Sequence, residues 1–113
     1  MKRYTLTDLI QMTDRDIDDA VARVIMNWRM SSGENACGRY WVWKDHHGEE
    51  KETTFYPTFN GGDCFRVIQR LVKHGKIIGI WDNRVFVGNE TWFYNDGNTA
   101  KAICCAALLT CQK

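Results

Sequence analysis

The fold of this chain is decided by Thr99-Ala100-Lys101-Ala102-Ile103-Cys104-Cys105-Ala106-Ala107-Leu108-Leu109, a stretch near the end of the printed sequence. A helix over these residues begins at Asn98 or Thr99, both of which are suitable N-cap residues. The helix is apolar on nearly every side, which is typical of helices that other elements cover completely. We therefore expect it to be buried in the core or to pack at an interface between subunits.

An amphipathic helix is expected over residues 13–28. Thr13 is a suitable N-cap, and Asp16 stands three residues later, as in a capping box with Asp in place of Glu. Apolar residues recur at helical spacing: Ile17, Ala20, Val21, Val24, Ile25 and Trp28. The first turns carry Asp14, Asp16, Asp18 and Asp19. Carboxylates there suit the positive end of the helix dipole, and a partner-facing acidic patch is the alternative explanation.

A further helix is expected after Asn60-Gly61-Gly62-Asp63, the clearest break in the chain. One face of this helix carries Cys64, Phe65, Ile68, Leu71 and Val72. Gly75 suits the position just beyond the end of a helix, so the helix is expected to end before it.

Two strands are expected between the first two helices. The aromatic run Tyr40-Trp41-Val42-Trp43 predicts a strand. Residues 31–38 are small and polar and predict a loop, and the polar residues 44–52 predict a hairpin loop or an excursion. Residues 53–56 are expected to return as a second strand, which Pro57 stops.

Three short strands are expected before the last helix, over residues 77–81, 85–87 and 91–94. Turn-forming pairs, Asp82-Asn83 and Gly88-Asn89, separate them. The order α-β-β-α-β-β-β-α predicts an α+β fold in which helices pack on an antiparallel β-sheet, as in a three-layer sandwich. Residues 1–113 are expected to form a single domain.

Composition and charge argue against several classes of protein. The 113 residues include 15 basic and 14 acidic ones, a net charge of +1. A general nucleic-acid binder needs a basic excess, so no direct DNA binding is expected. A DNA mimic needs an acidic excess, so the net charge also argues against that class.

No apolar run approaches the roughly 20 residues of a membrane span, and no secretory apolar segment is present, so no membrane association is expected. Five cysteines, three of them in the last helix, are typical of small core residues in a reducing cytoplasm.

Three stretches resemble the phage ABA sandwich domain family. The first is Met12-Thr13-Asp14-Arg15-Asp16-Ile17-Asp18, continuing to Asn27-Trp28, since the family opens on a similar cap and a helix that ends near a tryptophan. The second covers residues 59–71, with Asn60-Gly61-Gly62 in place of the family's Ser/Thr pair. The third is the last helix, which is similar to the family's Ala-Ile-Cys-x-Ala-Ala-Leu ending. The resemblance implies a sandwich fold and a phage origin, and it brings no catalytic residues.

Asn60, Gly61 and Gly62 form a candidate anion site. Glycines let the backbone approach a phosphate, and the helix N-terminus offers unpaired N–H groups. Arg66 would lie one turn into the helix and assist. The alternative is a tight turn in which Asn60 or Asp63 is the N-cap.

Trp41 and Trp43 form a candidate stacking platform for a nucleobase, with Arg39 nearby. Alternation along a strand places both tryptophans on one face. The alternative is that a helix covers this face and makes it part of the core.

No metal site or catalytic constellation can be assembled from the sequence. Adjacent positions on an extended chain point to opposite sides, so His46 and His47 are expected to be poor joint ligands. The spacings typical of zinc ligands are also missing. We therefore expect no metal, no cofactor and no enzymatic activity.

The resemblance implies a phage-encoded protein, and small phage proteins of this kind often act against host immunity. Because no catalytic constellation is found, we expect a non-enzymatic binding protein that counters antiviral defence in the cytoplasm of the infected bacterial host. One mechanism sequesters a small nucleotide second messenger, by stacking its base and holding its phosphate. The alternative is a protein-surface inhibitor, similar in action to an anti-CRISPR protein, which occludes a host defence protein. We expect a homo-oligomer, since so short a chain has little interior volume and an enclosed site would lie at a subunit boundary.

Overall fold

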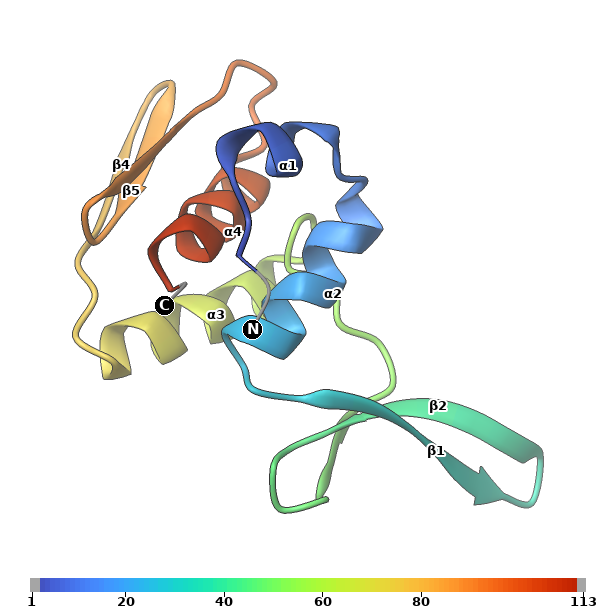
Figure 1. The fold of residues 1–113 in the computed structure, drawn as a ribbon. Helices are drawn as coiled ribbons and strands as arrows, with labels where there is room; N and C mark the ends of the chain where they lie inside the picture. The colour runs from blue at the N-terminus through green and yellow to red at the C-terminus, as the bar shows by residue number, and fades with distance from the viewer. Residues whose placement is uncertain (1–2, 112–113) are drawn as a thin grey trace.

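The computed structural model describes residues 3–111, which form four helices and two three-stranded antiparallel sheets (Figure 1). The helices are α1 (Leu6–Gln11), α2 (Asp14–Val24), α3 (Gly61–Lys73) and α4 (Thr99–Thr110). The first sheet contains β1 (Arg29–Asn35), β2 (Gly38–Lys44) and β3 (Glu50–Glu52), and the second contains β4 (Ile78–Trp81), β5 (Arg84–Val87) and β6 (Glu90–Phe93). The predicted α+β class is confirmed, and the order of elements matches roughly.

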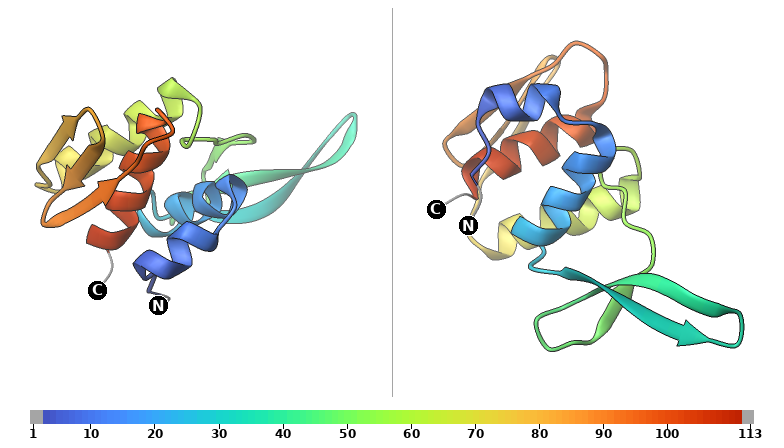
Figure 2. Two further views of the ribbon diagram at one scale, coloured as in Figure 1. Left: turned by 90° about the horizontal axis from the view of Figure 1, so that it is seen from above. Right: turned by 45° about the vertical axis from the view of Figure 1, so that its right-hand side comes forward.

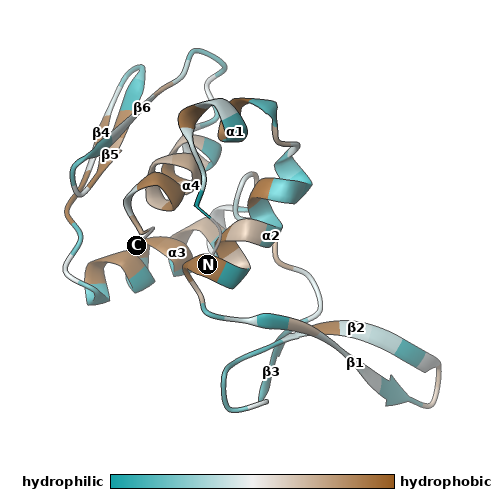
Figure 3. Ribbon diagram, in the orientation of Figure 1, coloured by the Kyte–Doolittle hydropathy of each residue, from teal (hydrophilic) through white to brown (hydrophobic). Residues whose placement is uncertain are grey.

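Helix α4 lies at the centre of the body. It packs against α2, α3 and strands β5 and β6, with the second sheet on one side and α1 and α2 on the other (Figures 1 and 2). Residues 102–108 are all buried, and Figure 3 colours most of α4 as hydrophobic, whereas α2 also carries hydrophilic residues. The predicted burial of the apolar helix is confirmed. Its cover comes from the same chain, so its apolar surface gives no reason for a subunit interface.

Helix α2 begins where the sequence predicts and ends earlier. The Thr13 hydroxyl accepts a hydrogen bond from the Asp16 N–H at 3.1 Å, and the Asp16 carboxylate accepts one from the Thr13 N–H at 3.4 Å. This capping box is the predicted one. The helix ends at Val24 rather than near Trp28, because Asn27 turns the chain with a φ of 59°. Trp28 then packs edge-on against Phe55, with ring centroids 4.9 Å apart.

Helix α3 has the predicted start and end. The Asn60 side chain caps the helix by accepting a hydrogen bond from the Asp63 N–H at 2.9 Å. At the other end Gly75 has a φ of 79°, and its N–H bonds the Val72 carbonyl at 2.9 Å while the Lys76 N–H bonds the Leu71 carbonyl at 3.0 Å. This pair of bonds is a Schellman motif, which requires the left-handed conformation that glycine adopts at low cost.

The first sheet is an arm that projects from the body (Figure 2). Its length makes the molecule elongated, with principal extents of 47 × 27 × 24 Å. The loop predicted over residues 31–38 is wrong, because residues 31–35 belong to β1 and pair with β2. The strand predicted over residues 53–56 is also wrong, because β3 lies earlier and ends at Glu52.

The pairing of β1 depends on a residue of its partner strand. Gly33 stands opposite Tyr40, and a Cβ atom at Gly33 would lie 2.5 Å from that ring. The aromatic ring therefore covers the glycine, a device that stabilises glycine-containing strands. The Tyr40 hydroxyl also donates to the Glu50 carboxylate at 3.0 Å. Residues 31–33 carry no alternating apolar pattern. The strand conformation of β1 is therefore explained by its contacts with β2 rather than by its own residue types.

The second sheet contains the three predicted strands. Val85 and Val87 of β5 are fully buried against α4. The layers of the body are the second sheet, then α4, then the remaining helices, so the middle layer is a helix. The strands form two separate sheets rather than the single sheet that the sequence predicts.

The cysteines fit the predicted role of small core residues at three positions. Cys64, Cys104 and Cys105 are buried, and Cys37 is exposed. Within residues 3–111 the structure contains no helix long and apolar enough to cross a membrane.

Candidate functional site

A large open cleft lies between α2, the arm and the segment of residues 53–59 that leads to α3. Its volume is about 870 Å³, which is within the usual size range of ligand sites. The α2 wall contributes Asp14, Arg15, Asp16, Asp18 and Asp19. The opposite side contributes Met30, Trp41, Trp43, Thr53, Thr54, Phe55, Tyr56 and Phe59. We call this the acidic–aromatic cleft.

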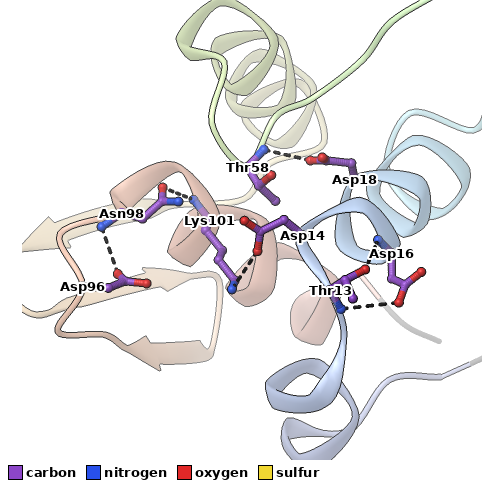
Figure 4. A network of polar contacts seen from close by, with 8 residues as sticks. All are labelled: Thr13, Asp14, Asp16, Asp18, Thr58, Asp96, Asn98 and Lys101. Carbon is purple, nitrogen blue, oxygen red and sulfur yellow. Dashed lines mark hydrogen bonds and ion pairs between the residues drawn. The ribbon is translucent and has the colours of Figure 1, made fainter.

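Two carboxylates of the α2 wall, those of Asp14 and Asp18, tie α2 to other elements (Figure 4). Asp14 forms an ion pair with Lys101 of α4 at 2.8 Å, and hydrogen bonding to that carboxylate raises the pKa of Lys101. Asp19 pairs with Arg23 at 2.8 Å. The side chains of Asp14 and Asp19 are still 51% and 46% exposed, so this wall presents negative charge to the cleft.

Asp18 is the buried member of this wall. It is 4% exposed, and its carboxylate accepts a hydrogen bond from the Thr58 N–H at 2.9 Å. Burial raises the pKa of Asp18 above its usual value, and hydrogen bonding from Thr58 partly offsets that increase. Asp18 therefore fixes the segment of residues 53–59 against α2 and so shapes the cleft.

The aromatic side of the cleft is largely accessible. Trp41 is 67% exposed and Phe59 is 66% exposed. Tyr56 stacks on Phe59 with ring centroids 5.3 Å apart. Trp43 is only 5% exposed, and the Arg23 guanidinium lies 5.3 Å from its ring centroid. Trp43 thus belongs to the core and Trp41 to the surface, although both line the cleft as the strand alternation predicts.

The remaining predicted site residues do not line the cleft with Trp41 and Trp43. Arg39 pairs with Glu34 at 3.5 Å across the outer end of the β1–β2 hairpin. Asn60 is used as the α3 cap, and Gly61 and Gly62 form the first turn of that helix. A Cβ atom at Gly61 would meet nothing within 4 Å, so nothing there requires a glycine. The residues of the proposed anion cradle thus have the alternative role, a helix start.

Arg66 fastens the arm to α3. Its guanidinium forms an ion pair with Glu52 of β3, and it lies 5.1 Å from the Trp28 ring centroid and 5.9 Å from that of Phe55. This guanidinium therefore has both a charged partner and aromatic neighbours within the chain. Its role in the structure is to hold β3 and α3 together.

Two cleft residues, Tyr56 and Phe59, had no counterpart in the sequence-based site. Both lie in a segment without regular structure. Tyr56 was expected only as the end of a strand over residues 53–56, and no strand or helix periodicity marks Phe59. The acidic wall, by contrast, was visible as the patch of aspartates near the start of α2.

The sequence analysis expected His46 and His47 on an extended chain with their side chains on opposite sides, and this geometry is wrong. Residues 45–48 form a turn, closed by a hydrogen bond from the Gly48 N–H to the Asp45 carbonyl at 3.0 Å. The rings of His46 and His47 therefore lie against one another, with centroids 3.9 Å apart. Among the described residues no group of three or more His, Cys, Asp or Glu side chains is placed to hold a metal ion.

Comparison with known proteins returned no match, since no family model, no curated protein and no solved structure matches this chain.

Proposed function

We propose that this chain is a non-catalytic binding protein whose acidic–aromatic cleft holds a positively charged segment of a partner protein. The observation that carries the proposal is that the α2 carboxylates face the exposed rings of Trp41, Tyr56 and Phe59 across an open cleft. Both groups attract cations, the carboxylates by charge and the rings through their electron-rich faces. A lysine or arginine side chain satisfies both at once.

The charge of the cleft favours a protein segment over a nucleotide. Asp14, Asp16 and Asp19 stand on the wall that a phosphate would approach, and Arg15 is the single basic residue of the lining. Like charges at short range raise the free energy of binding. The nucleotide hypothesis made from the sequence therefore has less support at Trp41 than the protein-surface alternative.

The resemblance to phage proteins supplies the biological part of the proposal. In that setting the partner is a host defence protein, and the chain occludes a basic surface of it in the infected bacterium. The projecting arm supports this role, because it widens the surface that a protein partner meets beyond the cleft itself (Figure 2).

The test uses a short fluorescently labelled peptide rich in arginine and glycine, with fluorescence anisotropy as the readout. We expect saturable binding that weakens as salt is added. The same peptide with neutral citrulline in place of arginine, and a cyclic dinucleotide, serve as matched ligands. Equal binding of the citrulline peptide would show that the cleft does not recognise positive charge and would contradict the proposal. Preferential binding of the dinucleotide would favour the nucleotide hypothesis instead.

Trp41→Ala and Trp81→Ala form a matched pair of variants. Both side chains are exposed, at 67% and 48%, and only Trp41 lines the cleft. We expect Trp41→Ala to weaken binding about five- to tenfold, the size of one favourable cation–π contact. Trp81→Ala is expected to bind like wild type, and equal losses in both variants would contradict the assignment of the cleft.

A further inference from the structure

A second cavity, of about 370 Å³, lies where the C-terminal ends of α2 and α3 meet. Its lining contains the polar residues Arg70, His74, Lys76 and Asn27, the apolar residues Val24, Ile25 and Leu71, and Cys111 at the end of α4. Among residues 3–111, no carboxylate side chain lines it. This cavity is separate from the acidic–aromatic cleft and has the opposite charge.

The basic residues of this cavity form no ion pair with the part of the chain that the structure describes. Arg23, Arg66 and Lys101 all form ion pairs with carboxylates elsewhere in the molecule. Within residues 3–111, Arg70, His74 and Lys76 form none. The positive charges of Arg70 and Lys76 at one cavity repel one another, and an anion bound there would relieve that repulsion.

Arg70 adds a second and independent observation. Its Nε atom is buried and has no hydrogen-bond partner among the described residues. A buried donor without an acceptor costs free energy. A guanidinium presents its N–H groups as a planar fork that matches the oxygens of a phosphate or carboxylate.

The C-terminal end of α3 does not oppose an anion as strongly as a free helix end would. The Gly75 N–H donates a hydrogen bond to the Val72 carbonyl at 2.9 Å, and the Lys76 N–H donates one to the Leu71 carbonyl at 3.0 Å. These bonds satisfy carbonyl oxygens that would otherwise carry the negative end of the helix dipole.

We propose that the cavity lined by Arg70, His74 and Lys76 binds a phosphate group. A phosphate has more acceptor oxygens than a carboxylate, which suits three convergent donor side chains. The apolar walls leave room for the organic part of a phosphate ester such as a mononucleotide, and the phosphate itself is recognised in the same way in both cases. The site is independent of the proposed function, since its residues do not line the acidic–aromatic cleft.

The test follows the Arg70 Nε–H resonance by NMR in protein labelled with nitrogen-15. Inorganic phosphate is added at constant ionic strength, with sodium chloride as the matched salt. We expect a saturable shift with phosphate and none with chloride. An equal response to chloride would overturn the proposal and leave Arg70 and Lys76 as charges that complement the helix end.

Adenosine monophosphate separates the two sources of the phosphate group. Tighter binding than inorganic phosphate, with shifts of the Val24 and Leu71 methyl groups, indicates a phosphate ester. Equal affinity without methyl shifts indicates free phosphate.

Variants check that the response comes from this cavity. Lys76→Gln is expected to weaken phosphate binding about tenfold, because it removes a charged donor without touching the core. Arg84→Gln is the control, since Arg84 stacks on Trp81 of the second sheet at 5.1 Å and does not line the cavity. Unchanged binding in Lys76→Gln, or an equal loss in Arg84→Gln, would contradict the site.

Discussion

The carboxylate of Asp18 accepts a hydrogen bond from the main-chain N–H of Thr58 at 2.9 Å, and both residues are almost fully buried. The bond joins positions 40 residues apart in the chain. The bond holds Thr58 against α2 and so contributes to the shape of the acidic–aromatic cleft.

Replacement of Asp18 by alanine is expected to lower the free energy of unfolding by about 1–3 kcal/mol, because the buried Thr58 N–H loses its acceptor. Asp18→Asn keeps an oxygen acceptor in the same place and is expected to cost less. Urea denaturation of the three proteins measures both effects. Equal stabilities of the Ala and Asn variants would show that the hydrogen bond is not what Asp18 contributes.

The stability of the wild type relative to Asp18→Asn is expected to depend on pH. Burial raises the folded-state pKa of Asp18 above the 3.8 of an unperturbed aspartate, so the folded protein binds this proton more tightly than the unfolded chain does. The wild type therefore gains stability relative to the variant as pH falls through the raised pKa toward 3.8. Above the raised pKa the difference is constant. Denaturation at a series of pH values checks this, and a difference that falls with decreasing pH has the wrong sign.

Arg66 is expected to contribute to stability rather than to ligand capture. Arg66→Ala removes the ion pair with Glu52 and the contacts with the Trp28 and Phe55 rings, which together are worth about 1–2 kcal/mol. Arg66→Lys keeps the charge but loses the planar group and is expected to lie between the two. Hydrogen exchange of the β3 amides reports whether the arm loosens. Wild-type stability and exchange in Arg66→Ala would refute this role.

Thiol labelling is expected to separate exposed from buried cysteines. Burial raises the pKa of the Cys105 thiol to about 12, and a protonated buried thiol reacts slowly. Cys37 is exposed and is expected to react with iodoacetamide in the native protein, whereas Cys105 reacts only after urea is added. Mass spectrometry of the peptides identifies the labelled sites. Removal of native-state labelling by Cys37→Ser is the control.

Two glycines are expected to respond to alanine in opposite directions. A Cβ atom at Gly79 would lie 2.5 Å from the Phe86 ring, so Gly79→Ala forces that ring aside at a cost of about 1–3 kcal/mol. Gly61 is in the first turn of α3 with open space around it, so Gly61→Ala is expected to add up to about 1 kcal/mol through helix propensity. Thermal unfolding distinguishes the two. A destabilised Gly61→Ala would restore a special role for that glycine.

The features predicted correctly from the sequence are those that depend on residues close together in the chain. The Thr13–Asp16 capping box, the Asn60 cap and the Gly75 end are each closed within one or two turns of a helix, so the side chains that form them can be read in order. The second sheet followed from turn-forming pairs between short apolar runs in the same way.

Features that depend on distant residues were missed. Residues 31–33 form a strand because the Tyr40 ring covers Gly33, which their own composition does not show. The candidate site was missed in part for a similar reason. Trp41 was identified, but Tyr56 and Phe59 reach the cleft through an irregular segment that the Asp18–Thr58 bond positions.

The central place of α4 also has a consequence for synthesis on the ribosome. Its packing partners α2, α3, β5 and β6 all precede it in the chain, so each is translated before the helix that covers it. Their apolar faces stay open to solvent and to chaperones until residues 99–110 leave the exit tunnel. Nascent chains that stall before α4 are therefore expected to be degraded rather than to persist as partial folds.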